Sequence, residues 1–248
     1  MRLDNKIALV TGGASGIGRA TVMELAHCGA LVICADLNEK AGKELSEEAR
    51  RLNLAVDYVQ VDMADRDSVR RCAADVLARH ARIDILVNAA GWNDIQPFIE
   101  NAPDYMDRVV AINLNGPLHL TQALLPAMMA AGGGKIVNVS SDAGRVGSSG
   151  ETTYAAAKGG LIAFTKSLAR EVARYSINVN CVCPGPTDTP MLQSRPEKLR
   201  EAFLRAIPFK RFAKPQEIAD AVVFFASPSS DYVTGQVISV SGGLTFAG

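Results

Sequence analysis

The residues best placed to do chemistry are Tyr154 and Lys158, which lie four positions apart in the stretch SSDAGRVGSSGETTYAAAKGG. Residues four apart on a helix share a face, so we expect the phenol and the ammonium to be neighbours. A free phenol has a pKa of about 10 and is a poor base at neutral pH. A nearby positive charge is expected to lower that pKa. Together with Ser141 upstream, the pair therefore indicates a group that could accept the proton of an alcohol.

The glycine-rich stretch TGGASGIGRA, at 11–20, directly follows a short apolar run. Gly12 permits a tight turn, Gly16 lets the backbone approach a pyrophosphate, and Gly18 lets a helix lie close to a sheet. The start of that helix would offer free N–H groups to phosphates. Arg19 stands where a P-loop needs its lysine, which argues against a nucleoside triphosphatase. The stretch therefore predicts a dinucleotide site.

Asp36 ends the second apolar run and favours NAD over NADP. A carboxylate at this place accepts hydrogen bonds from both hydroxyls of an adenosine ribose and would repel a 2′-phosphate. Leu37 follows instead of an arginine, and Ser15 occupies a turn position where a basic residue would help a phosphate. Asp62, after the third apolar run, could meet the adenine amino group or cap the next helix, and the spacing leaves both open.

Alternating strands and helices must position these residues. Helical patterns such as 65–80, with Asp65 as its expected N-cap, separate short, nearly continuous apolar runs that are typical of strands covered on both faces. The strands are expected at 7–10, 31–35, 56–61, 83–87, 135–139, 178–183 and 237–240. The alternation predicts an α/β fold with a doubly wound parallel sheet, in one domain over 1–248. The segment 186–210 interrupts it and is long enough to be a substrate lid.

Composition excludes several classes of protein. The 26 basic residues balance the 26 acidic ones, which gives no electrostatic case for nucleic acid or an anionic membrane. No run approaches the roughly 20 apolar residues of a membrane span, and the first residues lack a signal peptide, so we expect a cytoplasmic protein. The five cysteines and three histidines show no ligand-like spacing, so we expect neither disulfides nor a metal site. No G-x-S-x-G elbow supports a serine hydrolase.

The combined motifs resemble the short-chain dehydrogenase/reductase family over essentially the whole chain. The motifs that carry the resemblance are TGGASGIG, Asp36, NAAG at 88–91, Asn113, Ser141, YAAAK at 154–158 and PG at 184–185. The resemblance implies a Rossmann fold whose seven parallel strands run in the order 3-2-1-4-5-6-7, with the cofactor at the switch point. It also implies hydride transfer between a nicotinamide cofactor and a secondary alcohol. One departure is Ala89, where the family usually has a second asparagine.

The resemblance also implies the role of each site residue. Tyr154 would be the general acid/base, with Ser141 orienting the reacting oxygen. Lys158 would bind the nicotinamide ribose, and Asn113 would hold a water in a proton relay. The expected NAD contacts are Gly12, Ser15, Gly16, Ile17, Gly18, Asp36, Leu37, Asp62, Met63, Asn88, Ala90, Gly91, Tyr154, Lys158, Pro184, Gly185, Thr187 and Thr189.

The substrate is expected to contact loops at the carboxyl ends of the strands. The candidate residues are Trp92, Arg145, Ser148, Glu151 and Met191. Trp92 could form an apolar wall or be a surface or interface aromatic. Arg145 could meet a carboxylate or thioester, be solvated, or form a salt bridge between subunits. Basic residues near 186–210 could attract coenzyme A phosphates or form a solvated helix face. The second half is most similar to alicyclic β-hydroxyacyl-CoA dehydrogenases, with 3-oxoacyl-carrier-protein reductases and other alcohol or sugar dehydrogenases as alternatives.

Assembly follows from the resemblance and from one helix. The helix expected at 152–175 carries apolar residues, among them Leu168 and Val172, that one sheet layer would not cover entirely. With the resemblance, this suggests a homotetramer, with the C-terminal GGLTFAG at a second interface. A non-catalytic NAD-binding subunit is the alternative from another class. It is disfavoured because such members usually lose a motif residue that this chain keeps.

Overall fold

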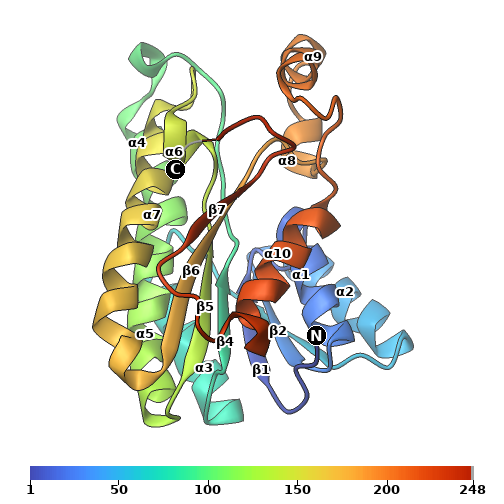
Figure 1. Ribbon diagram of the computed structural model, residues 1–248, viewed down its shortest axis with the longest axis vertical. Helices are drawn as coiled ribbons and strands as arrows, with labels where there is room; N and C mark the ends of the chain where they lie inside the picture. The colour runs from blue at the N-terminus through green and yellow to red at the C-terminus, as the bar shows by residue number, and fades with distance from the viewer. Residues whose placement is uncertain (247–248) are drawn as a thin grey trace.

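The computed structural model describes residues 1–246 and shows a seven-stranded parallel sheet between two layers of helices (Figure 1). The strands lie in the order β3-β2-β1-β4-β5-β6-β7, which confirms the expected fold class and strand order. The strands are β1 (Ile7–Thr11), β2 (Leu31–Asp36), β3 (Val56–Gln60), β4 (Ile85–Asn88), β5 (Gly134–Val139), β6 (Ile177–Pro184) and β7 (Val237–Val240). The strand expected at 83–87 thus begins two residues later, after Asp84, whose carboxylate accepts the Ile7 N–H at 2.9 Å.

Helices connect the strands and cover both faces of the sheet. They are α1 (Gly16–His27), α2 (Glu39–Arg51), α3 (Arg66–His80), α4 (Pro103–Val110), α5 (Gly116–Ala130), α6 (Ala143–Val146), α7 (Thr152–Val172), α8 (Pro190–Gln193), α9 (Glu197–Ala206) and α10 (Pro215–Ala226). Short 3-10 turns are η1 (Phe98–Glu100), η3 (Ala173–Tyr175) and η4 (Pro228–Ser230), and η2 (Ala111–Asn115) is a π-helical turn. Within residues 1–246, no helix is both long and apolar enough to cross a membrane.

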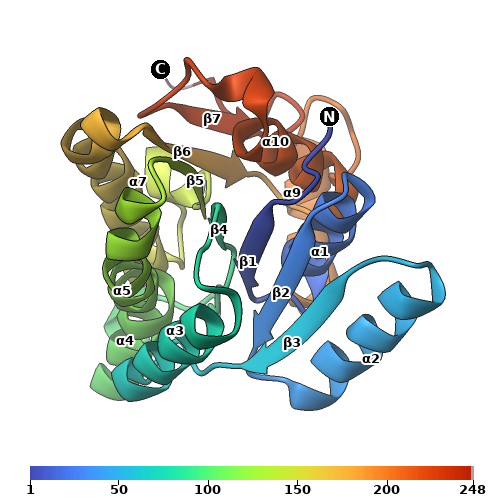
Figure 2. The same ribbon diagram turned by 90° about the horizontal axis from the view of Figure 1, so that it is seen from below.

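The strand side chains alternate between two buried clusters because successive residues of a strand point to opposite faces. In β1, Ala8 and Val10 pack with residues of α1, α2 and α10, whereas Leu9 packs with residues of α3, α5 and α7. Figure 2 shows these two groups of helices on either side of the sheet. The nearly continuous apolar runs of the sequence therefore reflect strands that are buried on both faces.

The start of α3 is set as the sequence predicts. The carboxylate of Asp65 accepts the N–H of Asp67 at 2.9 Å and caps the helix. Val69, Ala73 and Val76 are buried on one face of this helix, against the sheet. The amphipathic pattern thus aligns α3 with the core.

The expectation of uncovered apolar surface on α7 is wrong for two residues. Leu168 and Val172 are buried in the core of their own chain, because they lie on the face of α7 that packs on the sheet. Phe164 is half-buried and packs against the same cluster. The expected interface of the C-terminal segment includes Ala247 and Gly248, which lie outside the described residues.

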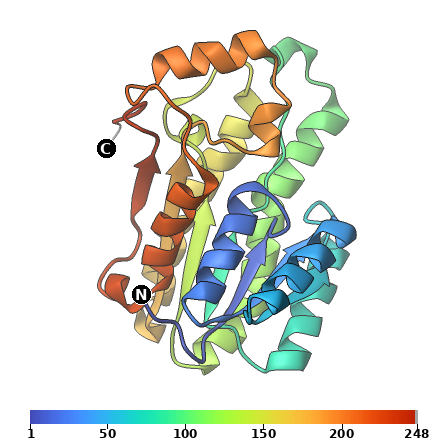
Figure 3. The same ribbon diagram turned by 90° about the vertical axis from the view of Figure 1, so that its right-hand side faces the viewer.

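The segment 186–210 lies across the carboxyl ends of the strands. Figure 3 shows its longer helix, α9, in orange above the sheet, beyond the ends of the strand arrows. The shorter helix α8 begins at Pro190 and is capped by the Thr189 hydroxyl, which accepts the Leu192 N–H at 3.4 Å. This segment therefore stands where a parallel α/β sheet binds its ligands.

Candidate active site

A cavity of about 710 Å³ opens at the carboxyl ends of the strands. The glycine turn and Asp36 line one end of it, and Ser141, Tyr154 and Lys158 line the other. The structure thus brings together residues that are more than a hundred positions apart in the sequence. Of the residues expected to contact the cofactor, all except Asn88 line this cavity.

The glycine turn presents bare backbone to the cavity. Gly12 has φ of +64°, and a Cβ atom there would lie 2.8 Å from the Cα of Ala90. A Cβ atom on Gly18 would lie only 2.0 Å from the carbonyl oxygen of Gly12. Ser15 is the N-cap of α1, and its hydroxyl makes no capping bond. The turn and the start of α1 therefore fit a pyrophosphate, which backbone N–H groups would hold.

Asp36 is held in place at the ribose end of the cavity. Its carboxylate accepts the N–H groups of Ala14 and Asn38, each at 2.9 Å. No lysine or arginine of the described residues lines the cavity beside Asp36, and Arg19 pairs with Glu48 outside it. This end of the cavity therefore carries negative charge.

Asp62 does not cap the next helix, and its other expected role, a contact with the adenine, stays a prediction. It lines the cavity, and its carboxylate also accepts the N–H of Ala64 at 2.8 Å. The cap of α3 itself is Asp65 rather than Asp62. The carboxylate of Asp62 thus stiffens the turn that follows β3 while it remains beside the adenosine end.

The expected contact between Asn88 and the cofactor is wrong for its side chain. Asn88 is 1% exposed, and its amide donates to Asn138 at 2.8 Å and to Thr121 at 3.3 Å. Asn138 in turn donates to Thr165 at 2.9 Å. The side chain therefore lies beneath the cavity, where it links β4 to β5 and α5.

Although Ala89 replaces the second asparagine usual in the family, the end of β4 is still hydrogen-bonded to β1. The Thr11 hydroxyl accepts the N–H groups of Ala89 and Ala90 at 3.1 and 3.2 Å. These bonds join the two strands at which the direction of chain winding reverses. The Thr11 hydroxyl thus joins β1 to the residues after β4 at the switch point without a second asparagine side chain.

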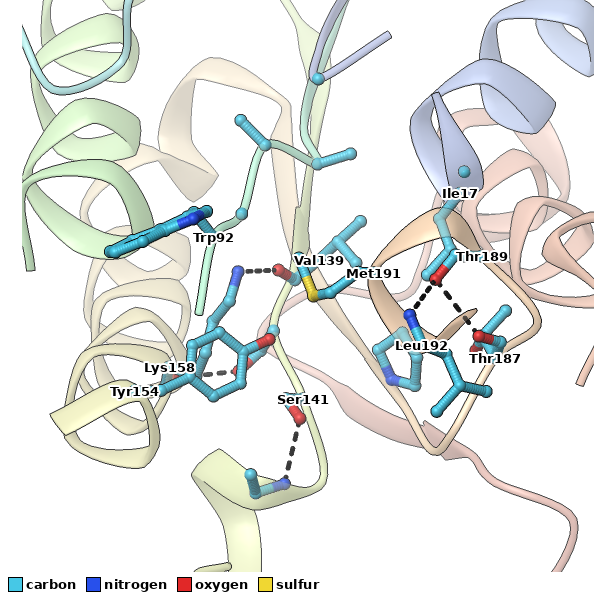
Figure 4. Close-up of a pocket in the computed structure, with 18 of the residues that line it drawn as sticks. Ile17, Trp92, Val139, Ser141, Tyr154, Lys158, Thr187, Thr189, Met191 and Leu192 are labelled. Carbon is cyan, nitrogen blue, oxygen red and sulfur yellow. Dashed lines mark hydrogen bonds between the residues drawn. The ribbon is translucent and has the colours of Figure 1, made fainter. Parts of the chain in front are cut away.

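Tyr154 and Lys158 lie on α7, and Ser141 follows β5; Figure 4 shows the three side chains around one space. The Lys158 ammonium donates to the Val139 carbonyl at 2.9 Å, and the Ser140 hydroxyl donates to the Lys158 carbonyl at 2.8 Å. These bonds hold α7 against the end of β5. The phenol, the ammonium and the Ser141 hydroxyl are thereby fixed near one another, as the sequence predicts.

Burial dominates the electrostatics of this group. It raises the pKa of Tyr154, and the Glu151 carboxylate adds to the rise, while the Ser141 hydroxyl and Arg195 act in the opposite sense. Burial also lowers the pKa of Lys158 to about 8. The expected lowering of the tyrosine pKa relied on the ammonium together with a positively charged nicotinamide, and that combined effect stays a prediction. The Lys158 amine donates to the Val139 carbonyl, and desolvation is the largest cause of the raised tyrosine pKa.

Asn113 lies in the π-helical turn η2 between α4 and α5, a feature common at functional sites. Its amide donates to the carbonyls of Trp92 and Val109, at 2.7 and 2.8 Å, and its oxygen accepts the Trp92 N–H at 3.3 Å. A Cβ atom on Gly91 would lie 3.1 Å from the Asn113 oxygen and 3.5 Å from the Lys158 amine. Asn113 thus holds the loop after β4 beside Lys158.

Four of the five predicted substrate residues line the cavity: Trp92, Ser148, Glu151 and Met191. The expectation for Arg145 is wrong. Its side chain is 11% exposed, does not line the cavity, and lies 3.6 Å from the Asp142 carboxylate. The two residues are three apart at the start of α6, so the Arg145 guanidinium pairs with Asp142 and is not available to a substrate.

Sequence analysis missed Arg108, which also lines the cavity. Its guanidinium lies 4.4 Å from the ring centroid of Trp92, and the Tyr105 ring meets the same indole edge-on at 5.5 Å. Tyr105 and Arg108 are three apart on α4 and share a face. This i, i+3 spacing could not have predicted the contact with Trp92, because it does not indicate which loop packs against that face of α4.

Comparisons with known proteins agree with this geometry. A family model described as "Enoyl-(Acyl carrier protein) reductase" matches residues 12–245. A 3-oxoacyl-[acyl-carrier-protein] reductase FabG from Thermotoga maritima is 43% identical, covering 98% of this chain and 99% of its own. A (3R)-3-hydroxyacyl-CoA dehydrogenase from Canis lupus familiaris is 39% identical, covering 98% of both chains. The crystal structure of a putative gluconate dehydrogenase from Agrobacterium tumefaciens is 31% identical, with a TM-score of 0.94 over 98% of this chain and 97% of that one.

Proposed function

The chain belongs to the short-chain dehydrogenase/reductase family, and from that premise we propose that it is an NAD-dependent dehydrogenase of 3-hydroxyacyl-CoA thioesters. One observation carries the proposal. A single cavity runs from a glycine turn and an unopposed Asp36 to the group formed by Ser141, Tyr154 and Lys158. That arrangement suits the interconversion of a secondary alcohol and a ketone.

The chain's own groups would handle the proton. A bound nicotinamide would supply the hydride acceptor or donor for the carbon. The Tyr154 hydroxyl exchanges a proton with the oxygen on that carbon, and the Ser141 hydroxyl donates a hydrogen bond that orients this oxygen. Lys158 would hold the nicotinamide ribose. Because the Asn113 oxygen and the Lys158 amine face the same side of Gly91, a water between them would pass the proton onward.

The electrostatics of the ribose end support NAD as the cofactor. Asp36 lines the cavity with its carboxylate already oriented by two backbone N–H groups. Its neighbour Leu37 is 56% exposed and offers no charge. A 2′-phosphate would meet a carboxylate with no counter-charge, so discrimination against NADP follows from repulsion.

The substrate end supports an acyl thioester with a compact, apolar acyl group. Trp92, Ile95, Val146 and Met191 supply apolar walls, and a cyclic acyl group such as that of 2-hydroxycyclohexanecarboxyl-CoA matches such a pocket. The hydroxyacyl-CoA dehydrogenase named among the relatives acts on this chemical class. Reduction of a 3-oxoacyl carrier protein is the second candidate, supported by the FabG relatives.

The segment 186–210 would act as a lid over the substrate. Met191, Phe203 and Ala206 of this segment line the cavity, so its movement would admit and cover the substrate.

Four copies of the chain would assemble. The edge strand β7, whose four residues are all partly exposed, is available for such an interface. Sedimentation at micromolar concentration should give four times the 26.3 kDa of the chain. A particle of 26.3 kDa would contradict the tetramer.

A spectrophotometric screen tests the function. Hydroxyacyl-CoA thioesters, free secondary alcohols and sugar acids are assayed for reduction of NAD and of NADP. The proposal expects NADH to form with a thioester, and kcat/KM with NAD to exceed that with NADP by at least about tenfold. Preferred reduction of a 3-oxoacyl thioester by NADPH would favour the second candidate. Dinucleotide binding without turnover of any compound would favour a non-catalytic subunit.

A further inference from the structure

Arg108 and Trp92 form a fixed pair at the substrate end of the cavity. Both line it, and the guanidinium lies 4.4 Å from the centroid of the indole. The Trp92 peptide is held on both sides by the Asn113 side chain, and Tyr105 packs against the ring. Because the indole cannot move freely, the cation stacked on it also has a defined place.

Arg108 differs from the other charged side chains at this end. Arg195 donates to Asp94 at 3.1 Å, and Glu151 accepts from Asn93 at 2.7 Å. Over residues 1–246, the Arg108 guanidinium makes neither an ion pair nor a hydrogen bond, and the residue is exposed. A residue that lines the cavity thus has N–H donors whose bonding capacity is unused.

The geometry points to an anion subsite: Arg108, supported by Trp92, binds an anionic oxygen group that the substrate carries outside the reacting atoms. A guanidinium binds phosphate or carboxylate through paired N–H donors. The inference rests on the proposed function, because a coenzyme A thioester carries phosphates on the arm that leaves the cavity. The second source of the same chemistry is the carboxylate of a free hydroxy acid.

Three substrates with the same acyl group separate these sources. They are the coenzyme A thioester, the uncharged N-acetylcysteamine thioester and the free hydroxy acid, each assayed with NAD at low ionic strength. The proteins are the wild type, Arg108→Gln and the matched control Arg174→Gln. Arg174 is also exposed and lies 4.8 Å from the centroid of Tyr175, but it does not line the cavity.

The expected effect is selective for charge. Arg108→Gln should lower kcat/KM for the coenzyme A thioester by about 5- to 30-fold, mainly through KM, because one charge-assisted contact is lost. The same variant should change kcat/KM for the neutral thioester by less than about twofold. The loss should shrink as salt is added, since the contact is exposed. Arg174→Gln should behave as the wild type.

Trp92 gives a second readout that does not need turnover. It is the only tryptophan of the chain, so its fluorescence reports on this end of the cavity. With NAD saturating, coenzyme A should change the Trp92 fluorescence with a Kd about 5- to 30-fold higher in Arg108→Gln than in the wild type. Pantetheine, which lacks phosphate, should bind both proteins equally.

A loss confined to the coenzyme A thioester, or to the free acid, supports the subsite and identifies phosphate or carboxylate as its ligand. Equal losses on all three substrates would make Arg108 a packing residue and overturn the inference, as would no loss on any of them. If the wild type oxidises neither thioester with NAD or NADP, the proposed function fails. The fluorescence titration with coenzyme A then decides the subsite by itself.

Discussion

Tyr154 and Lys158 share a face of α7, yet burial moves their pKa values in opposite directions. Burial raises the pKa of the phenol and lowers that of the ammonium to about 8. Each group is driven toward its neutral form, because desolvation penalises charge. Both shifts favour the neutral phenol, the form of Tyr154 that can donate a proton when a ketone is reduced. Oxidation of an alcohol requires additional positive charge beside the phenol, which an oxidised nicotinamide would bring.

Replacing Tyr154 by phenylalanine should separate chemistry from binding. The variant keeps the ring and loses only the hydroxyl, so turnover should fall by about 10²- to 10⁴-fold, the range of a lost general acid/base. Dinucleotide affinity, measured by isothermal titration, should stay within about threefold. Tyr175→Phe, at the far end of the same helical segment, is the control. Unchanged turnover in Tyr154→Phe would remove Tyr154 from the mechanism.

The lowered pKa of Lys158 predicts a pH dependence of stability. Between about pH 8 and the ordinary lysine pKa, the unfolded chain binds a proton that the folded chain does not, so stability rises with pH there. The free energy of unfolding of the wild type should therefore gain about 2 kcal/mol over Lys158→Met between pH 8 and 10. Urea titrations at several pH values measure the difference. A constant difference across that window would contradict the assigned shift.

At the scale of elements, the end of β4 and the loop that follows it carry two kinds of residue. Gly91 and Trp92 face the cavity, whereas Asn88 lies below it in a buried network with Asn138 and Thr121. The network connects the strand to β5 and α5 by side-chain bonds where the strand pairing ends. The end of β4 thus acts as the support on which the loop after it is built.

The support role of Asn88 predicts that its loss affects stability rather than cofactor binding. Asn88→Ala should lower the free energy of unfolding by about 1–3 kcal/mol, because buried partners lose their bonds. Its Kd for NAD should remain within about threefold. Asp62→Ala, on the cavity wall, should do the reverse and weaken NAD binding with a smaller effect on stability. Weaker NAD binding in a normally stable Asn88→Ala would restore the contact expected from the sequence.

At the scale of the whole molecule, segments from distant parts of the chain meet around the cavity. Arg195, in the segment 186–210, is 10% exposed in its side chain and donates to Asp94 at 3.1 Å and to the Asn93 carbonyl at 2.5 Å. These bonds join residues about a hundred positions apart. They hold the segment over the loop that follows β4, which also carries Trp92.

Loss of this link should loosen the segment 186–210. Arg195→Gln should raise KM for the substrate by about 5- to 20-fold, since charge-assisted bonds are lost, and should speed proteolysis within 186–210. Arg205→Gln is the matched control, because Arg205 pairs with Glu201 along α9 and does not line the cavity. Equal effects of the two substitutions would show that helix stability, not the link to Asp94, holds the segment.

The sequence by itself determined the elements and the chemistry that short spacings carry. Apolar runs located the strands, and helical periods located helices such as α3 and α7, because both patterns reflect burial of local faces. The glycine turn, Asp36 and the pair Tyr154 and Lys158 were identifiable, since each depends on neighbours within one turn or one helix face. The order of the strands in the sheet came from the resemblance to a family, because the positions of the elements along the chain do not determine it.

Only the tertiary structure decided which side chains remained available. The Asn88 amide is hydrogen-bonded to Asn138, and the Arg145 guanidinium is paired with Asp142. Leu168 is buried in the core. The Arg108 guanidinium, by contrast, lies over Trp92 without an ion pair to any described residue. The balance of burial against charge at Tyr154 also depends on everything packed around it. These outcomes rest on contacts between segments far apart in the chain, and local spacing does not encode which of those segments meet.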